Sequence, residues 1–181
     1  MDIIRARDLT VGYGRTEVLR DLAFAVPEGR ITVILGVSGS GKSTLLKTLA
    51  GLLPPLGGEF DFAGSRVDYR SEASLRSLYG KIGVLYQGGA LLNGLSLFEN
   101  VALPIRMQHP KMPEDMVRDM VHASLAQVEL AGSAEKYPAE LSGGMTKRGA
   151  LARALVLDPD VVFCDEPSSG LDPITSALLD D

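Results

Sequence analysis

The sequence is poor in the residues and segments that secreted and membrane-spanning proteins need. It has one cysteine, Cys164, no tryptophan, and no apolar run near the roughly 18 residues of a membrane-spanning helix. A lone cysteine excludes an internal disulfide and indicates a reducing compartment, and the N-terminal residues lack the basic-then-apolar order of a signal peptide. We therefore expect a cytoplasmic protein that does not itself cross a membrane.

An excess of charge of one sign is also missing. The 181 residues carry 18 Lys and Arg against 23 Asp and Glu, a formal net charge of −5. This balance gives no general attraction for nucleic acid or anionic lipid. With 45% hydrophobic and 23% charged residues, the chain has the composition of a globular domain, which excludes collagen-like and wholly disordered proteins.

The first part of the chain predicts strands at residues 3–9, 18–26 and 31–35, separated by glycine-rich turns. The third run is apolar on both faces, a pattern typical of a strand inside a sheet that helices cover. A helix over 43–50 follows, and Gly51 is placed to end it. The order of elements predicts an α/β fold with a mainly parallel core sheet and an N-terminal antiparallel β part.

The middle of the chain is mainly helical. Ser96 and Glu99 have the spacing of a capping box, and Pro113 suits the start of a helix that runs to about residue 129. We interpret residues 90–140 as a helical insert, with 1–89 and 141–181 as the core of one domain. The remaining predicted elements are strands at 59–62, 81–86 and 161–164 and a helix from the glycines after Ser142 to residue 157.

Residues 36–43 read Gly-Val-Ser-Gly-Ser-Gly-Lys-Ser and match the phosphate-loop pattern G-x-x-x-x-G-K-[ST]. The alternative is a flexible glycine turn with an exposed lysine, but a predicted strand and helix flank the loop as its mechanism requires. Backbone N–H groups would hold phosphate, Lys42 would reach the terminal phosphates, and the Ser43 hydroxyl would ligate Mg²⁺. The predicted nucleotide-binding residues here are Gly36, Ser38, Gly39, Ser40, Gly41, Lys42, Ser43 and Thr44.

Two acids, Asp165 and Glu166, follow the predicted strand 161–164. Acids at a strand end are often only solvated, but beside a phosphate loop they form the second half of a nucleotide site. Asp165 would bind Mg²⁺ through water, and Glu166 would act as general base on the water that attacks the γ-phosphate.

Leu141-Ser142-Gly143-Gly144-Met145 resembles the LSGGQ signature of ATP-binding-cassette (ABC) ATPases, with methionine in the last place. On its own a serine before two glycines is more often a helix N-cap. Here it lies between the phosphate loop and the acid pair, in the family's order. Further resemblances are Tyr13 to the aromatic that stacks on adenine, Gln87 to the Q-loop glutamine, and Ser169-Gly-Leu-Asp172 to the D-loop.

The resemblance covers essentially the whole chain and implies an ATPase that uses ATP and Mg²⁺ and binds no nucleic acid. It implies a head-to-tail dimer, in which Ser142, Gly143 and Gly144 hold a nucleotide bound to the partner's phosphate loop, and membrane permease subunits that the dimer drives. Besides the phosphate-loop residues, the implied nucleotide contacts are Tyr13, Gln87 and Asp172. The implied catalytic residues are Lys42, Gln87 and Glu166, and the implied Mg²⁺ ligands are Ser43, Gln87 and Asp165.

Met145 and the segments 87–93 and 101–106 look like the ATPase subunit of Mla-type, MCE-associated phospholipid transporters. That family implies an MCE-domain partner and a position on the cytoplasmic face of the inner membrane. An ABC ATPase of a different importer stays an alternative. ABC ATPases of DNA repair fit less well because the segment between Gln87 and Ser142 is too short for their coiled coil.

The sequence ends at Asp181, before the switch histidine of the family and the strand that precedes it. His109 and His122 both precede the signature and cannot replace that histidine. We therefore expect a fragment of a longer protein, with a nucleotide-binding but non-hydrolysing module as the alternative. Two further expectations are a buried, inert Cys164 and a methionine stripe at 112, 116 and 120. The stripe would belong either to the core or to a groove for the permease.

Overall fold

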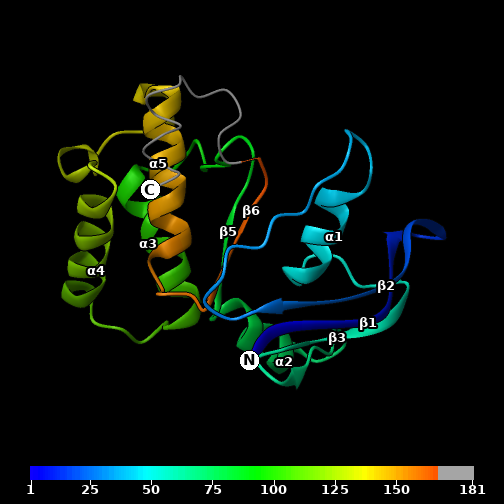
Figure 1. The fold of residues 1–181 in the computed structure, drawn as a ribbon. Helices are drawn as coiled ribbons and strands as arrows, with labels where there is room; N and C mark the ends of the chain where they lie inside the picture. The colour runs from blue at the N-terminus through cyan, green and yellow to red at the C-terminus, as the bar shows by residue number, and fades with distance from the viewer. Residues whose placement is uncertain (167–181) are drawn as a thin grey trace. The chain divides into compact units, whose positions relative to one another are not determined.

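The computed structural model describes residues 1–166, in two compact units. The first unit is Met1–Tyr79, and the second starts at Gly80. Each is a separate body with its own sheet (Figure 1). Within residues 1–166, no helix combines the length and the apolar character that crossing a bilayer demands.

The first unit is built on a four-stranded antiparallel sheet. Its strands are β1 (Asp2–Tyr13), β2 (Thr16–Pro27), β3 (Gly57–Phe62) and β4 (Ser65–Arg66), in the order β2-β1-β3-β4. Ile4, Leu9 and Val11 of β1 are buried on one side of the sheet. The strands predicted at 3–9, 18–26 and 59–62 and the antiparallel character of this part are confirmed.

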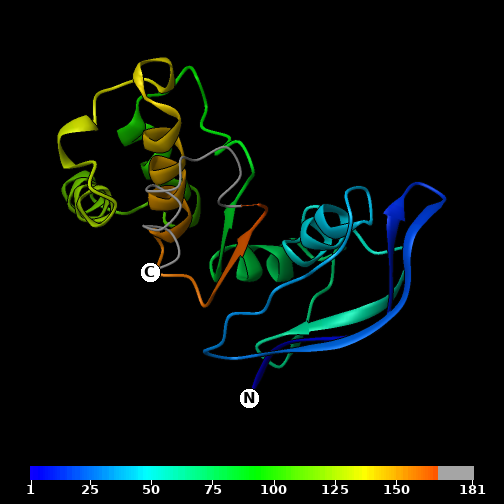
Figure 2. The same cartoon turned by 45° about the horizontal axis from the view of Figure 1, so that its top comes forward.

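Helix α1 (Lys42–Leu49) packs over one face of this sheet (Figure 2). Leu45, Leu46 and Leu49 are its buried apolar residues. The helix ends at Leu49, and Gly51, the residue predicted to end it, follows two positions later with a φ of 77° in the left-handed region. A short helix α2 (Glu72–Tyr79), which was not predicted, closes the unit; it buries only Leu78 and so has little apolar pattern to reveal it.

The strand predicted at residues 31–35 is wrong for the described structure. The segment belongs to no strand, and Ile31 and Leu35 are 95% and 87% exposed. A strand needs neighbours for its backbone N–H and C=O groups, and among residues 1–166 no other strand pairs with this segment. The segment has apolar residues on both faces. Such residues would be buried on both faces only in a strand that lies between two neighbouring strands.

The second unit contains a two-stranded parallel sheet of β5 (Ile82–Leu85) and β6 (Val161–Cys164). Both strands lie where they were predicted. The expected burial of β6 is wrong, because Cys164 is exposed and the rest of the strand is half-buried. Within the described residues β6 pairs on one side only. Partial desolvation nevertheless raises the pKa of the Cys164 thiol, so the reactive thiolate is not favoured.

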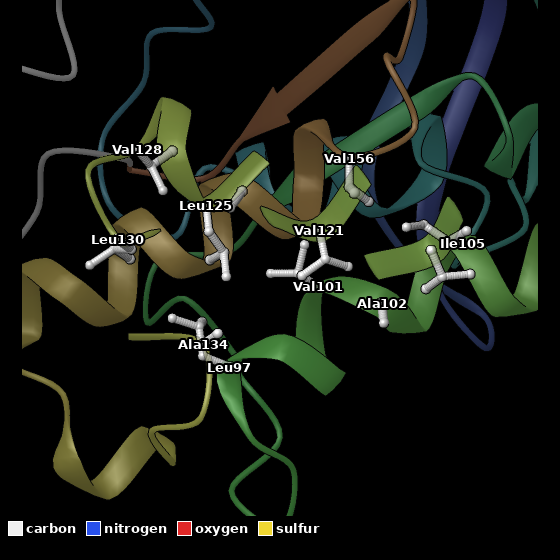
Figure 3. Close-up of a cluster of buried hydrophobic side chains, with 12 residues drawn as sticks. Leu97, Val101, Ala102, Ile105, Val121, Leu125, Val128, Leu130, Ala134 and Val156 are labelled. Carbon is white, nitrogen blue, oxygen red and sulfur yellow. The ribbon is translucent and has the colours of Figure 1, made fainter. Parts of the chain in front are cut away.

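Three helices form the core of the second unit: α3 (Leu97–Gln108), α4 (Glu114–Gln127) and α5 (Gly143–Leu155). Their buried faces meet in one hydrophobic cluster (Figure 3). The short 3-10 turns Ala131–Ser133 and Pro138–Glu140 connect α4 to α5. The predicted capping box at the start of α3 is confirmed, and Pro113 is the N-cap of α4.

The methionine stripe of the insert belongs mainly to this core. Met112 and Met120 pack against the hydrophobic cluster, as do Leu91 and Phe98, whereas Met116 is 52% exposed. Asn100, on α3, is fully buried and holds the preceding loop through hydrogen bonds to the backbone of Leu92. The interpretation of the stripe as core therefore holds for most of its residues.

Candidate functional site

The phosphate loop, residues 36–41, leads directly into α1. The Lys42 ammonium bends back over the loop, where Nζ donates hydrogen bonds to the carbonyl oxygens of Gly36 at 2.8 Å and Val37 at 3.0 Å. The amide of Ser40 donates to Val37 O at 3.1 Å and closes the turn. The cation therefore lies at the mouth of the loop, where a phosphate oxygen can replace the carbonyls as its partner.

Helix α1 begins without a side-chain cap. Among the described residues none caps its N-terminus, and its first turn has no acidic residue. The first N–H groups of a helix lack partners within the helix and carry positive potential. Together with Lys42 they make this end of α1 suited to a phosphate group.

Glycines shape this loop, and at Gly39 and Gly41 the backbone conformation itself favours glycine. A Cβ on Gly36 would lie 2.5 Å from Ser40 Oγ, and one on Gly41 would lie 2.7 Å from a methyl carbon of Val18. Gly41 also has φ of 95°, and Gly39 has φ of 78°. The loop therefore takes a backbone conformation and a close approach to β2 that side chains oppose.

The other predicted nucleotide contacts of the first unit lie in this loop, in the first turn of α1 and at the end of β1. Ser38 is exposed, Ser40 is half-buried, and Ser43 is exposed in the first turn of α1. Thr44, in contrast, is buried, so it is less accessible than these serines. Tyr13 ends β1 and is 49% exposed, so its ring is accessible for stacking.

In the second unit the structure brings Gln87 and Glu166 together. Gln87 follows β5 and Glu166 follows β6, and Gln87 Nε2 donates to Glu166 Oε2 at 2.7 Å. The amide of Asp165 donates to Leu85 O at 2.9 Å, which extends the pairing of the two strands to the acid pair. Adjacent parallel strands thus deliver the amide and the carboxylates to one sheet edge.

The signature serine is the N-cap of α5. Ser142 Oγ accepts a hydrogen bond from the amide of Met145 at 3.2 Å, and Gly143 and Gly144 form the exposed or half-buried first turn. Met145 itself packs against the hydrophobic cluster. The N-cap interpretation is therefore correct, and it is compatible with binding an anion because other amides of this turn remain at the helix end.

A residue that sequence reasoning missed stands near the other end of α5. Arg153 donates through its two terminal nitrogens to the carbonyl oxygens of Ala90 and Gly89, both at 2.8 Å. Burial lowers the pKa of Arg153 from its usual value, but a guanidinium stays charged at neutral pH. The only signal in the sequence is an arginine among the small, buried alanines 150, 152 and 154 of the helix.

The predicted nucleotide and Mg²⁺ residues are divided between the two units. The phosphate loop belongs to the first unit, and Gln87, Ser142, Asp165 and Glu166 belong to the second, so the Mg²⁺ set of Ser43, Gln87 and Asp165 stays a prediction. Over residues 1–166 no group of three or more His, Cys, Asp or Glu side chains forms a metal site. Asp172 and the D-loop lie outside the described residues.

Comparison with known proteins gives a family match over most of the chain. The family model described as ABC transporter matches residues 19–169. The Mycobacterium tuberculosis protein named "Probable ribonucleotide transport ATP-binding protein mkl" is 44% identical over 97% of this chain and 49% of its own length. "Intermembrane phospholipid transport system ATP-binding protein MlaF" of Haemophilus influenzae is 43% identical over 98% of this chain and 67% of MlaF. This chain therefore spans about half the length of the mycobacterial relative.

Solved structures agree with this match. The cbiO1 protein of Clostridium perfringens, part of the ABC transporter complex cbiONQ, gives a TM-score of 0.85 at 31% identity and covers 98% of this chain and 70% of its own. A dimeric ATP-binding cassette in a post-hydrolysis state, bound to ADP and Pi, gives a TM-score of 0.86 at 30% identity. The match covers 96% of this chain and 78% of that cassette. The predicted α/β fold of an ABC-type phosphate-loop ATPase is confirmed.

The glycines of the phosphate loop provide a matched pair of substitutions. Alanine at either Gly39 or Gly41 places a side chain at positive φ, but only at Gly41 does the new Cβ meet Val18 and Leu19. We expect Gly41→Ala to lower the free energy of unfolding by about 1–2 kcal/mol more than Gly39→Ala, measured by urea denaturation. Equal losses for the two variants would show that the contact of this loop with β2 is not tight.

Proposed function

This chain belongs to the ABC transporter family, and on that premise we propose that it binds ATP with Mg²⁺, hydrolyses it, and thereby drives a membrane transporter. The observation that carries the proposal is the phosphate loop, with Lys42 poised over carbonyls that a phosphate can displace and α1 starting behind it. The names of the relatives, each an ATP-binding protein of a transport system, support it.

Phosphate binding would use the first unit. Lys42 Nζ exchanges the carbonyls of Gly36 and Val37 for β- and γ-phosphate oxygens, and the loop amides and the α1 N-terminus bind the remaining oxygens. The adenine ring would stack on Tyr13. Ser43 and Asp165 offer a hydroxyl and a carboxylate, the oxygen donors that suit Mg²⁺, and Gln87 adds an amide oxygen. When bound, the ion would neutralise charge on the phosphates.

Hydrolysis would use the second unit. Glu166 accepts a proton from a water molecule as its oxygen attacks the γ-phosphorus, and the bond to the bridging oxygen breaks to leave ADP and inorganic phosphate. Gln87 donates to the same carboxylate at 2.7 Å, which places its amide beside the base and beside the water that the base would hold. Gln87 would therefore orient both the Glu166 carboxylate and the attacking water.

The anion site at the start of α5 would serve a second copy of the chain. Ser142 and the amides of Gly143 and Gly144 would bind the γ-phosphate of a nucleotide held by Lys42 of the partner copy. The similarity to a dimeric cassette bound to ADP and Pi supports this arrangement. ATP would close such a head-to-tail dimer, and hydrolysis would open it. The difference between the affinities of the closed dimer for ATP and for ADP would therefore drive the opening and closing movement.

The cargo that we propose is phospholipid. The 43% identity to MlaF of Haemophilus influenzae supports it, together with Met145 and the segments 87–93 and 101–106. The full complex would then hold permease subunits and an MCE-domain protein, with this subunit on the cytoplasmic face of the inner membrane. The second candidate is a nucleotide cargo, because the 44% identical mycobacterial relative is named a probable ribonucleotide transport protein.

Residues 1–89 and 141–181 would form the nucleotide-binding core, and residues 90–140 the helical insert. The insert would also receive the permease, because four of its large hydrophobic residues are exposed. Met107 on α3 is 68% exposed and Met116 on α4 is 52% exposed, and Leu92 and Tyr137, in the connecting segments, are each 48% exposed. Apolar side chains that remain exposed on an otherwise packed helical body favour a protein partner.

Glu166→Gln separates hydrolysis from binding. The amide cannot accept the proton of the attacking water, so we expect ATPase activity of the full-length protein to fall at least about 100-fold. ATP binding, measured by equilibrium dialysis with Mg²⁺, should be retained. Lys42→Ala is the matched variant that should lose binding as well. Undiminished hydrolysis in Glu166→Gln, or undiminished binding in Lys42→Ala, would contradict the assigned roles.

The two cargo candidates separate in a reconstituted system. We expect ATP to drive movement of a fluorescent phospholipid by the complete transporter, purified with its permease subunits and placed in liposomes. Radiolabelled ribonucleotide should not accumulate under the same conditions. Glu166→Gln in the same complex is the control for dependence on hydrolysis. ATP-dependent ribonucleotide uptake without lipid movement would overturn the phospholipid proposal.

A further inference from the structure

The segment after β5 makes a tight turn around Gln87. The amide of Gly89 donates to Tyr86 O at 2.8 Å, so Gln87 occupies the second position of a four-residue turn. Gly89 and Ala90 follow with φ of 76° and 50°, both in the left-handed region. An alanine in that region costs about 1 kcal/mol, so contacts from elsewhere must hold it there.

Those contacts come from Arg153 on α5. Its guanidinium binds the carbonyl oxygens of Gly89 and Ala90, each at 2.8 Å, and these are charge-assisted hydrogen bonds. Among residues 1–166 no carboxylate forms an ion pair with Arg153. The charge of a partly buried arginine is therefore directed at the backbone of this turn.

The turn also rests directly on α5. A Cβ on Gly89 would lie 3.3 Å from both Thr146 O and Thr146 Cγ2, and 3.4 Å from Ala150 Cβ. Close to the other end of β5, a Cβ on Gly83 would lie 2.3 Å from Ala154 O. The strand and the turn after it are therefore both in close contact with α5.

We propose that Arg153 is a positioning residue for hydrolysis, because it fixes the turn that aims Gln87 at Glu166 and fastens that turn to α5. The Gln87 turn is anchored at its start by β5 and at its end by Arg153. The same helix begins at Ser142, about three turns from Arg153. A displacement of Ser142 by nucleotide on a partner copy thus reaches the side chain beside the general base.

This inference rests on the proposed ATPase activity, and its kinetic test uses Arg153→Lys in the full-length protein. An ammonium cannot bind both carbonyls in the fork geometry of a guanidinium. We expect kcat to fall about 10- to 100-fold, because a misplaced group costs that much, with KM for ATP nearly unchanged. Arg148→Lys, on the same helix but paired with Glu129, is the matched control and should keep its kcat.

A double-mutant comparison separates positioning from general weakening. If Arg153 acts through Gln87, Arg153→Lys combined with Gln87→Ala should be no slower than Gln87→Ala alone. Gly89→Ala adds a Cβ that presses on Thr146 and Ala150 and so displaces the turn. By itself it should lower kcat as much as Arg153→Lys does. Combined with Gln87→Ala, it should be no slower than Gln87→Ala alone. Rate losses that multiply in the double variants would overturn the inference.

Hydrogen exchange tests, independently of ATPase activity, whether Arg153 holds the Gln87 turn in place. In Arg153→Lys we expect faster amide exchange over residues 86–91, with protection of α3 and α4 unchanged. Unchanged exchange over 86–91 would overturn the positioning role even in an active enzyme. A wild-type protein without ATPase activity would overturn the proposed function and the kinetic role together, while the exchange result would still show whether Arg153 holds the turn.

Discussion

The two hydrogen bonds from Arg153 to Gly89 and Ala90 are the contact on which the geometry of the second unit depends. They hold the chain in the left-handed turn that it must make after β5, and so they set where Gln87 lies relative to Glu166. Because the arginine belongs to α5, one helix connects the strand edge to the signature serine. Helices α3 and α4 pack against the same helix.

The first unit meets a different constraint, because its phosphate loop must hold several N–H groups and the Lys42 ammonium close together in one turn. Glycine at 39 and 41 allows the turn, and the antiparallel sheet supports it through the contact of Gly41 with β2. Lys42 satisfies its own donors on the loop carbonyls. A phosphate bound as we propose would replace these hydrogen bonds of Lys42 with charge-assisted ones.

Local signals predicted most of the elements, and the candidate site rests on such signals too. The glycines and Lys42, the capping box of Ser96 and Glu99, and the acids after β6 are short patterns whose mechanism lies within a few residues. The strand at 31–35 failed because pairing depends on a distant neighbour that no local pattern contains. Arg153 was missed for a similar reason, since its partners are carbonyls 63 and 64 residues away and carry no side-chain signature.

The central claim is that ATP joins two copies of this cassette and that hydrolysis separates them. Sedimentation velocity of full-length Glu166→Gln protein, with and without ATP and Mg²⁺, measures this most directly, because the variant should bind nucleotide without consuming it. We predict a shift from monomer to dimer that requires ATP, that ADP does not cause, and that Ser142→Arg abolishes. A protein that binds ATP yet stays monomeric, or a dimer indifferent to nucleotide, would contradict the account.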